Sequence, residues 1–192
     1  MSKPRRIALF GGTFDPIHLG HLEIARRAKE LLDLDEVRFL PCHTSPHKVG
    51  VLSAPAADRL EMARLATREL PWVVVDDFDL SRPPPSYSYE TAEEMRQRFP
   101  RARLFWLMGA DQWRALPRWK APQRLAKLVE FIVFARDGEP EPRAGWPMHF
   151  LGGTHPASAT AIRQAMVEGQ TGLPWLDPEV EKFIRRRHLY GT

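Results

Sequence analysis

The chain has 192 residues, of which 43% are hydrophobic and 27% charged, a composition typical of a globular protein with one domain. Its apolar runs are far too short to cross a membrane, and the run at residues 7–10 leads into glycines, as in a strand rather than a signal peptide. One cysteine, Cys42, excludes an internal disulfide and a cysteine-cluster zinc site, and a net charge of +4 favours anionic partners.

No nucleic-acid-binding module is visible in the sequence, so the favoured anionic partners are phosphorylated small molecules. We therefore expect a cytoplasmic protein that binds neither nucleic acid nor a membrane. The sequence leaves the oligomeric state open, a homo-oligomer included.

Short apolar runs and helical patterns alternate along the whole sequence. The runs predict strands at residues 7–10, 36–40, 72–78, 104–108 and 129–135, with a short sixth strand at 148–151. Helices are predicted after Pro16, at residues 58–67, 86–99 and 158–167, and from the Asp177-Pro178 cap onward. Strands separated by helices indicate an α/β fold: a Rossmann-like open parallel sheet of five or six strands with helices on both faces, in one domain over residues 1–192.

Residues 5–22 combine a strand, a glycine turn and the start of a helix. Gly11 and Gly12 allow a sharp turn and a close approach of the backbone to a ligand, since neither carries a Cβ atom. In an open α/β sheet this is the crevice where nucleotides bind, beside the free N–H groups of the helix start. The turn has no lysine and lacks the GxGxxG spacing, so neither a P-loop nor a dinucleotide fingerprint is implied.

His18 and His21 stand three residues apart at the predicted helix start, so both imidazoles can face one phosphate chain. Imidazole donates N–H hydrogen bonds and can carry charge near neutral pH, which suits negative charge that builds up during phosphate transfer. Taken alone, the pair is equally well explained by two surface histidines beside a glycine turn.

The sequence Gly-Gly-Thr-Phe-Asp-Pro, followed directly by His-x-Gly-His, is more specific. It resembles the signature of the HxGH nucleotidyltransferase superfamily, and GGTFDPIHLGHL is most similar to bacterial nicotinate-mononucleotide adenylyltransferases. The resemblance implies transfer of AMP from ATP to nicotinate mononucleotide, which gives nicotinate adenine dinucleotide and pyrophosphate in NAD biosynthesis. It also implies ATP contacts from the turn and the histidine pair, with Thr13 facing the mononucleotide as well: Gly11, Gly12, Thr13, Phe14, His18 and His21.

A polar segment at residues 41–48, PCHTSPHK, follows the second predicted strand and therefore lies at the ligand-binding edge of the sheet. His47 and Lys48 offer two donors to an anion. Cys42, His43 and His47 match no usual zinc spacing, which makes a metal site the weaker interpretation, and an exposed basic loop is the simple alternative. In the resembling family a Pro-His-Lys here lines the nucleotide pocket, which implies mononucleotide contacts at His47 and Lys48.

A Gly-Ala-Asp sequence, residues 109–111, follows the fourth predicted strand. Asp111 can accept hydrogen bonds from ribose hydroxyls or hold water around Mg²⁺, although a lone aspartate here is more often a helix N-cap. MGADQWRALPRWK resembles the GAD…LPxW stretch of the family, which implies ATP contacts at Gly109 and Asp111 and stacking of Trp119 on the pyridine ring. Trp106 and Trp113 are expected in the core or the pocket wall.

Residues 157–163, ASATAIR, predict a capped helix start with an arginine one turn in. Ser158 or Thr160 can cap the helix and leave backbone N–H groups for phosphate oxygens, which Arg163 can also reach with a bidentate fork. An ordinary capped helix with a surface arginine explains the same pattern. The segment resembles the family's ISSTxIR, with alanines at 157 and 159, and the resemblance implies ATP contacts at Ser158, Thr160 and Arg163.

Two further candidates concern the mononucleotide. Ser86, Tyr87 and Ser88 are similar to the family's Ser-Tyr-Thr, which contacts the nicotinate carboxylate largely through backbone N–H groups. Arg136, after the fifth predicted strand, is a candidate for the mononucleotide phosphate.

Two patterns receive simpler interpretations. Residues 185–188, RRRH, lie in the last turn of the predicted C-terminal helix, where cations oppose the negative end of the helix dipole, so we prefer that interpretation to a nucleic-acid patch. A second glycine pair, GGTHP at residues 152–156, echoes the first, and chance similarity is the simpler explanation.

The reaction implied by the resemblance needs no general base, because an anionic phosphate is already a nucleophile for in-line attack on the α-phosphorus of ATP. Catalysis is then positioning and electrostatic stabilisation, which we assign to His18, His21 and Arg163. No protein metal site or carboxylate cage is visible, so Mg²⁺ is expected to arrive with ATP, held by phosphates and water. The alternatives are another transferase on the same fold (using phosphopantetheine, nicotinamide mononucleotide or a cytidylyl donor), a nucleotide-binding regulator without catalysis, and a nucleic-acid binder.

Overall fold

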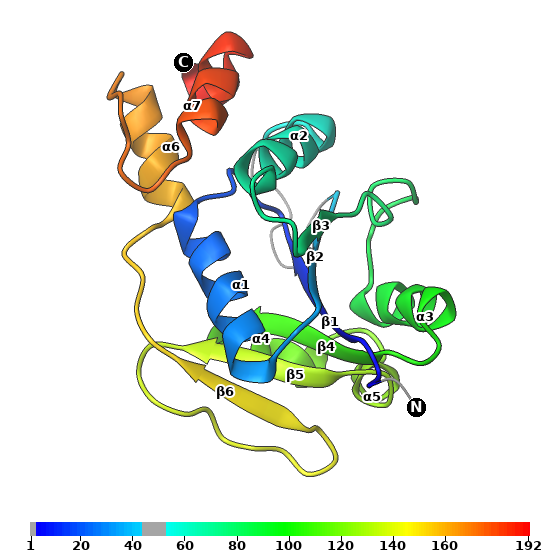
Figure 1. The fold of residues 1–192 in the computed structure, drawn as a ribbon. Coiled ribbons are helices and arrows are strands. Elements are labelled where there is room, and N and C mark those ends of the chain that lie inside the picture. The colour runs from blue at the N-terminus through cyan, green and yellow to red at the C-terminus, as the bar shows by residue number, and fades with distance from the viewer. Residues whose placement is uncertain (1–2, 44–52) are drawn as a thin grey trace.

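The computed structural model describes residues 3–43 and 53–192, and strands and helices alternate along most of the chain (Figure 1). The strands are β1 (Arg6–Gly12), β2 (Glu36–Pro41), β3 (Val73–Val75), β4 (Arg103–Gly109), β5 (Glu130–Ala135) and β6 (Met148–Gly152). The helices are α1 (Leu19–Leu32), α2 (Ala56–Thr67), α3 (Ser88–Arg98), α4 (Ala110–Ala115), α5 (Pro122–Ala126), α6 (Ala159–Val167) and α7 (Pro178–Arg186), with 3₁₀ turns η1 (Leu116–Arg118) and η2 (Leu189–Gly191). Within the described ranges, no helix is both long and apolar enough to span a bilayer.

The six strands form one sheet in the order β3-β2-β1-β4-β5-β6, and every neighbouring pair is parallel. The chain builds one half of the sheet outward from β1 and then returns to build the other half from β4. The strand order therefore reverses between β1 and β4, and sheets of this kind bind ligands outside the carboxyl ends of the strands at such a point. The prediction of a Rossmann-like parallel sheet is confirmed, with six strands.

Helices cover both faces of the sheet, as predicted. Side chains alternate along β1, so that Ala8 and Phe10 join one buried cluster and Ile7 and Leu9 the other. The first cluster takes residues from α1, α2, α6 and α7, and the second takes residues from α3, α4 and α5. Because the central strands are buried on both faces, they are apolar at almost every position, which is why short unbroken apolar runs identified them.

Two elements, β3 and α3, are shorter than the sequence predicts by more than one residue, and both differences affect the ligand-binding edge. The third strand ends at Val75 because the buried carboxylate of Asp76 accepts a hydrogen bond from the backbone N–H of Phe78 at 2.9 Å, which turns the chain. Helix α3 begins at Ser88 rather than at residue 86, since Tyr87 has extended backbone angles (φ −99°, ψ 129°). Ser86 and Tyr87 therefore lie outside the helix, with Tyr87 in an extended conformation.

Candidate active site

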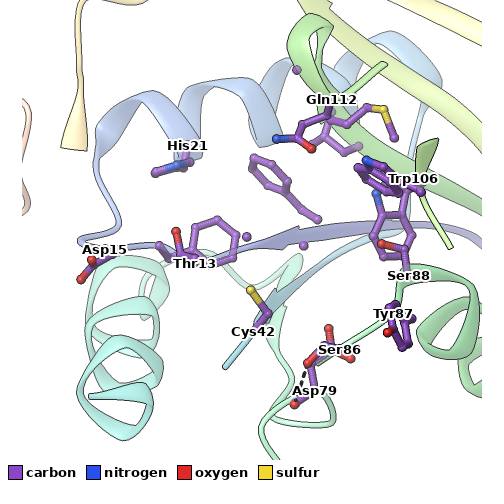
Figure 2. A pocket seen from close by; sticks show the side chains of 18 of the residues that line it. Thr13, Asp15, His21, Cys42, Asp79, Ser86, Tyr87, Ser88, Trp106 and Gln112 are labelled. Carbon is purple, nitrogen blue, oxygen red and sulfur yellow. Dashed lines mark hydrogen bonds between the residues drawn. The ribbon is translucent and has the colours of Figure 1, made fainter. Parts of the chain in front are cut away.

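A pocket of about 730 Å³ lies at the carboxyl ends of β1 and β4, a volume in the usual range for small-molecule sites (Figure 2). Gly11, Gly12 and Thr13 form one side of it. A Cβ atom at Gly11 would lie 3.2 Å from the ring of Trp106, and one at Gly12 would lie 3.1 Å from the ring of Phe14. Gly11 and Gly12 are the last two residues of β1 and pair with Leu40 and Pro41 of β2, so the chain does not turn at these glycines as predicted. It turns directly after them, and we call residues 11–16 the glycine turn. Because neither glycine carries a Cβ atom, the two aromatic rings can pack closely against this end of β1.

The C-terminal end of the chain contacts the turn after β1 through a side-chain hydrogen bond. The buried carboxylate of Asp15 accepts hydrogen bonds from the hydroxyl of Tyr190 at 2.6 Å and the backbone N–H of Ala54 at 3.1 Å. Burial and the Asp15 carboxylate together raise the pKa of Tyr190 far above its ordinary value, so the phenol keeps its proton and remains a donor. Arg163 on α6 donates to the backbone carbonyl of Asp15 at 2.6 Å, which joins α6 to the same turn.

The two histidines of the predicted pair lie against each other but differ in their access to the pocket. His18 caps α1 with extended backbone angles, and its N–H donates to Nδ1 of His21 at 3.2 Å. The two rings stack with centroids 3.8 Å apart and an interplanar angle of 24°. His21 lines the pocket, whereas His18 is buried against it with an exposed fraction of 9%.

The electrostatic states of the two rings follow from this placement. Burial, and then the nearby imidazole of His155, lower the pKa of His18 to about 4, so this ring is uncharged at neutral pH. A neutral imidazole still donates one N–H hydrogen bond. In this arrangement His21 has direct access to a ligand, and the buried ring of His18 stacks against the ring of His21 on the side away from the pocket.

The opposite side of the pocket carries the residues assigned to the mononucleotide. Ser86, Tyr87, Ser88 and Trp119 all line the cavity, and Figure 2 shows the three labelled residues of the 86–88 segment on the side opposite His21. Arg118 and Lys120 line the same region, which gives it two cationic groups beside the half-buried indole.

Asp79 lies beneath this side of the pocket. Its backbone carbonyl accepts a hydrogen bond from the hydroxyl of Ser86 at 3.1 Å, and its carboxylate accepts one from the hydroxyl of Thr91 at 2.6 Å. The residue is 5% exposed, and burial raises the pKa of this carboxyl to about 6. The segment that presents Ser86 to the pocket is thus anchored by an acid that titrates close to neutral pH.

Other predicted residues lie beside the cavity or away from it. Asp111 is exposed and pairs with Arg114, and Gly109, which does line the pocket, is the N-cap of α4 in place of the aspartate. Arg136 is exposed after β5 and is not part of the lining. His47 and Lys48 lie outside the described residues.

Helix α6 reaches the pocket only through its first residue, Ala159. Ser158 caps the helix by accepting a long hydrogen bond, 3.5 Å, from the backbone N–H of Ala161. Arg163 donates to the hydroxyl of Thr160 at 3.4 Å, so these predicted side chains cluster at the rim.

Several residues of the site carry no signal in the sequence. Asp79 stands among other acids and no pattern distinguishes it from Asp76 or Asp77. Gln112 lines the pocket from α4, where its position relative to the cavity depends on the packing of that short helix. For Lys120 the sequence offered only its place beside a tryptophan.

The described residues contain no group of three or more histidine, cysteine, aspartate or glutamate side chains placed to hold a metal ion. The two carboxylates in the pocket lining, those of Asp15 and Asp79, each already accept hydrogen bonds from the protein. This donor set fits a divalent cation that is held by phosphates and water better than one held in a protein cage.

The glycine turn and the histidine pair lie at the switch point of the parallel sheet. The cytidylyltransferase-like family model matches residues 9–165, which identifies the class as a nucleotidyltransferase. Three proteins named probable nicotinate-nucleotide adenylyltransferase are similar over nearly the whole chain. A Thermus thermophilus protein is 42% identical, with 96% of this chain and 99% of that protein covered. The Shouchella clausii protein is 37% identical, with 97% of each covered, and a Neisseria meningitidis protein is 40% identical, with 97% and 98% covered. This chain therefore belongs to the nicotinate-nucleotide adenylyltransferase family.

Solved structures with lower sequence identity share the fold. A Plasmodium falciparum nicotinic acid mononucleotide adenylyltransferase complexed with NaAD is 15% identical, with a TM-score of 0.78 and 97% of each chain covered. The same protein complexed with APC is 16% identical, with a TM-score of 0.77 and the same coverage. The overall fold is thus retained at low identity.

Proposed function

We propose that this protein transfers AMP from ATP to nicotinate mononucleotide, with nicotinate adenine dinucleotide and pyrophosphate as products. One observation carries the proposal beyond family membership. A single cavity is lined on one side by the glycine turn with His21, and on the other by Trp119 with residues 86–88. Two ligands bound at these two sides would meet above the carboxyl ends of β1 and β4, where the α-phosphorus must be attacked.

In the ATP half, the turn offers backbone N–H groups and His21 offers an imidazole to the phosphates. His18 is uncharged, so its contribution is to support His21 and to donate one N–H when the phosphates approach. Ser158, Thr160 and Arg163, at the start of α6, would hold the departing β- and γ-phosphates. All of these groups are preorganised donors, which stabilise developing charge without reorganising during the reaction.

In the mononucleotide half, the indole of Trp119 offers an aromatic face to the pyridine ring. Ser86 and Tyr87 precede α3, and Tyr87 is extended, so their backbone N–H groups would be available for the nicotinate carboxylate; Arg118 and Lys120 add positive charge nearby. His47, Lys48 and Arg136 remain candidates for the mononucleotide phosphate. The attacking phosphate oxygen is already anionic, so this half of the site has only to orient it.

Mg²⁺ would enter with ATP and neutralise part of the charge on the phosphates. The hydrogen-bonded states of Asp15 and Asp79 favour coordination by phosphate oxygens and water. ATP and nicotinate mononucleotide are the proposed partners, in the cytoplasm, with neither nucleic acid nor a membrane required.

A substrate panel tests the proposal. Pyrophosphate release is measured with ATP and, side by side, nicotinate mononucleotide, nicotinamide mononucleotide and phosphopantetheine, and the highest kcat/KM is expected with the first. Turnover on phosphopantetheine alone would assign the chain to a different transferase, and ATP binding without pyrophosphate release on any acceptor would indicate a regulator.

Alanine variants of His18 and His21 test the assignment of the histidines. Each is expected to lower kcat about 10²-fold with the fold intact, as expected for the loss of one preorganised donor. His149→Ala is the matched control, because His149, on β6, pairs with Glu130 on β5 and does not line the pocket. Turnover near wild type in the His18 and His21 variants would refute the assignment.

A further inference from the structure

The second glycine pair, at residues 152–156, carries a histidine to which the proposed reaction gives no role. His155 lies in the connection between β6 and α6, which runs beside α1 to its N-terminal end (Figure 1). Arg27 on α1 donates to the carbonyl of Gly152, and Nδ1 of His155 accepts a hydrogen bond from the N–H of Ala157 at 3.1 Å. The ring of Trp175 packs edge-on to the imidazole, with centroids 5.3 Å apart. These contacts hold His155 in place beside the start of α1.

Gly20 brings His155 and His18 together. A Cβ atom at Gly20 would lie 3.0 Å from Nδ1 of His155 and 3.0 Å from Nδ1 of His18, so both rings approach the one residue in the first turn of α1 that has no side chain. Nδ1 of His18 is also buried without a hydrogen-bond partner among the described residues. The ring of His18 therefore lies between His155, on the Gly20 side, and the stacked ring of His21.

We propose that His155 is a positioning residue for nucleotidyl transfer: it packs against His18 across Gly20 and holds that ring in the stacked pair that reaches the pocket through His21. The inference rests on the proposed function. Packing fixes His18 because a buried nitrogen without a hydrogen bond does not itself select one ring orientation. Removing His155 would free space beside His18 and loosen the pair that faces the phosphates.

The charge on His155 supplies a readout of this contact. When protonated, His155 opposes protonation of His18 because the two positive charges repel. This repulsion is the second largest cause of the lowered pKa of His18, and burial is the largest. The other titratable or charged side chains around the contact are His21, which stacks on His18, and Glu23 and Arg27 on α1. Arg163 on α6 is bound to the carbonyl of Asp15 in the neighbouring turn. Since these groups remain in a His155 variant, a change in the titration of His18 reports on His155.

Two substitutions separate the ring from its hydrogen bond. His155→Asn keeps an acceptor for the N–H of Ala157 and removes the ring, and His155→Phe keeps an aromatic ring against Trp175 and removes the charge. His149→Asn, at a half-buried histidine on β6, is the matched control. In each ligand-free protein, proton NMR follows the resonance of the His18 proton on Cε1 against pH. The values of kcat and KM are then measured with ATP and nicotinate mononucleotide.

In both His155 variants the titration midpoint of His18 is expected to rise toward its ordinary value by about half a pH unit or more. In His155→Asn, kcat is expected to fall about tenfold with the KM for the mononucleotide unchanged, because displacement of a positioned group acts on the chemical step. His149→Asn is expected to change neither quantity.

An unchanged His18 midpoint in both variants overturns the proposal, whether or not kcat falls, because a loss of activity alone would then reflect a structural role. If His155→Asn fails to fold, His155→Phe decides by the titration midpoint of His18 alone. If the wild-type protein releases no pyrophosphate with any mononucleotide, the proposed function fails, and the His18 titration still decides whether His155 positions that ring.

Discussion

Arg59 on α2 holds three segments around the mouth of the site, and its replacement gives the sharpest test of how the turn is supported. Its exposed fraction is 1%. Nη1 donates to the carbonyl of Thr13 at 2.6 Å, Nη2 to that of His43 at 2.8 Å, and Nε to that of Ala54 at 3.0 Å. One guanidinium thus joins the glycine turn, the end of β2 and the start of α2.

We expect Arg59→Met to lower the free energy of unfolding by about 3 kcal/mol. Methionine keeps much of the apolar stem, but it leaves three carbonyls without this donor. Hydrogen bonds from a charged group contribute about 1.5–3 kcal/mol each, so three of them amount to about 4–9 kcal/mol. Several kcal/mol are recovered because the variant no longer buries a cation. For a chain of this length the net loss corresponds to a fall in Tm of roughly 10 °C.

Thermal and urea unfolding measure the loss, with Arg64→Met on the same helix as the matched control. The side chain of Arg64 is 51% exposed and lies 3.8 Å from Glu61, so its replacement is expected to cost less than about 0.5 kcal/mol. The KM for ATP is also expected to rise in Arg59→Met, because the carbonyl of Thr13 is released. A loss of unfolding free energy below about 1 kcal/mol in Arg59→Met would refute the reasoning.

Two further predictions concern the mononucleotide side of the pocket. Because burial raises the pKa of Asp79 to about 6 from an ordinary value of 3.8, the folded state loses stability as pH rises from about 4 to above 6, when a buried carboxyl must ionise. Asp79→Asn should therefore be more stable than wild type at pH 8 by about 1–3 kcal/mol, with little advantage at pH 4; urea unfolding at both pH values measures this, and lower stability at pH 8 would contradict it. Trp119→Ala is expected to raise the KM for nicotinate mononucleotide about tenfold or more, as stacking contributes about 1–3 kcal/mol, while Trp119→Phe retains most of the affinity. Steady-state kinetics with ATP saturating provide the measurement, and an unchanged KM in Trp119→Ala would place the pyridine ring elsewhere.

Much of the fold was predictable because its signals are local. Unbroken apolar runs between helical patterns indicated the six strands, and the glycines after residue 10 marked the carboxyl end of β1 at the ligand-binding edge, although the turn itself follows them. The boundaries that moved did so through side-chain hydrogen bonds, as at Asp76, whose carboxylate ends β3 three residues before the predicted limit. At Asp111 the local pattern suited an N-cap, but the helix begins after Gly109 and leaves the aspartate exposed.

What the sequence by itself determined is therefore the order of strands and helices, the glycine pair that ends β1, and the edge of the sheet at which Ser86, Trp119 and the histidine pair lie. Periodicity and turn chemistry act between near neighbours, so they can be seen in the chain without its fold. Only the tertiary structure decided that His21 faces the pocket while His18 is buried beneath it. It also decided that Tyr190 supports Asp15 from 175 residues away and that Gly20 admits the ring of His155. Burial, and the pKa that follows from it, depends on which distant segments pack together, and no local pattern carries that information.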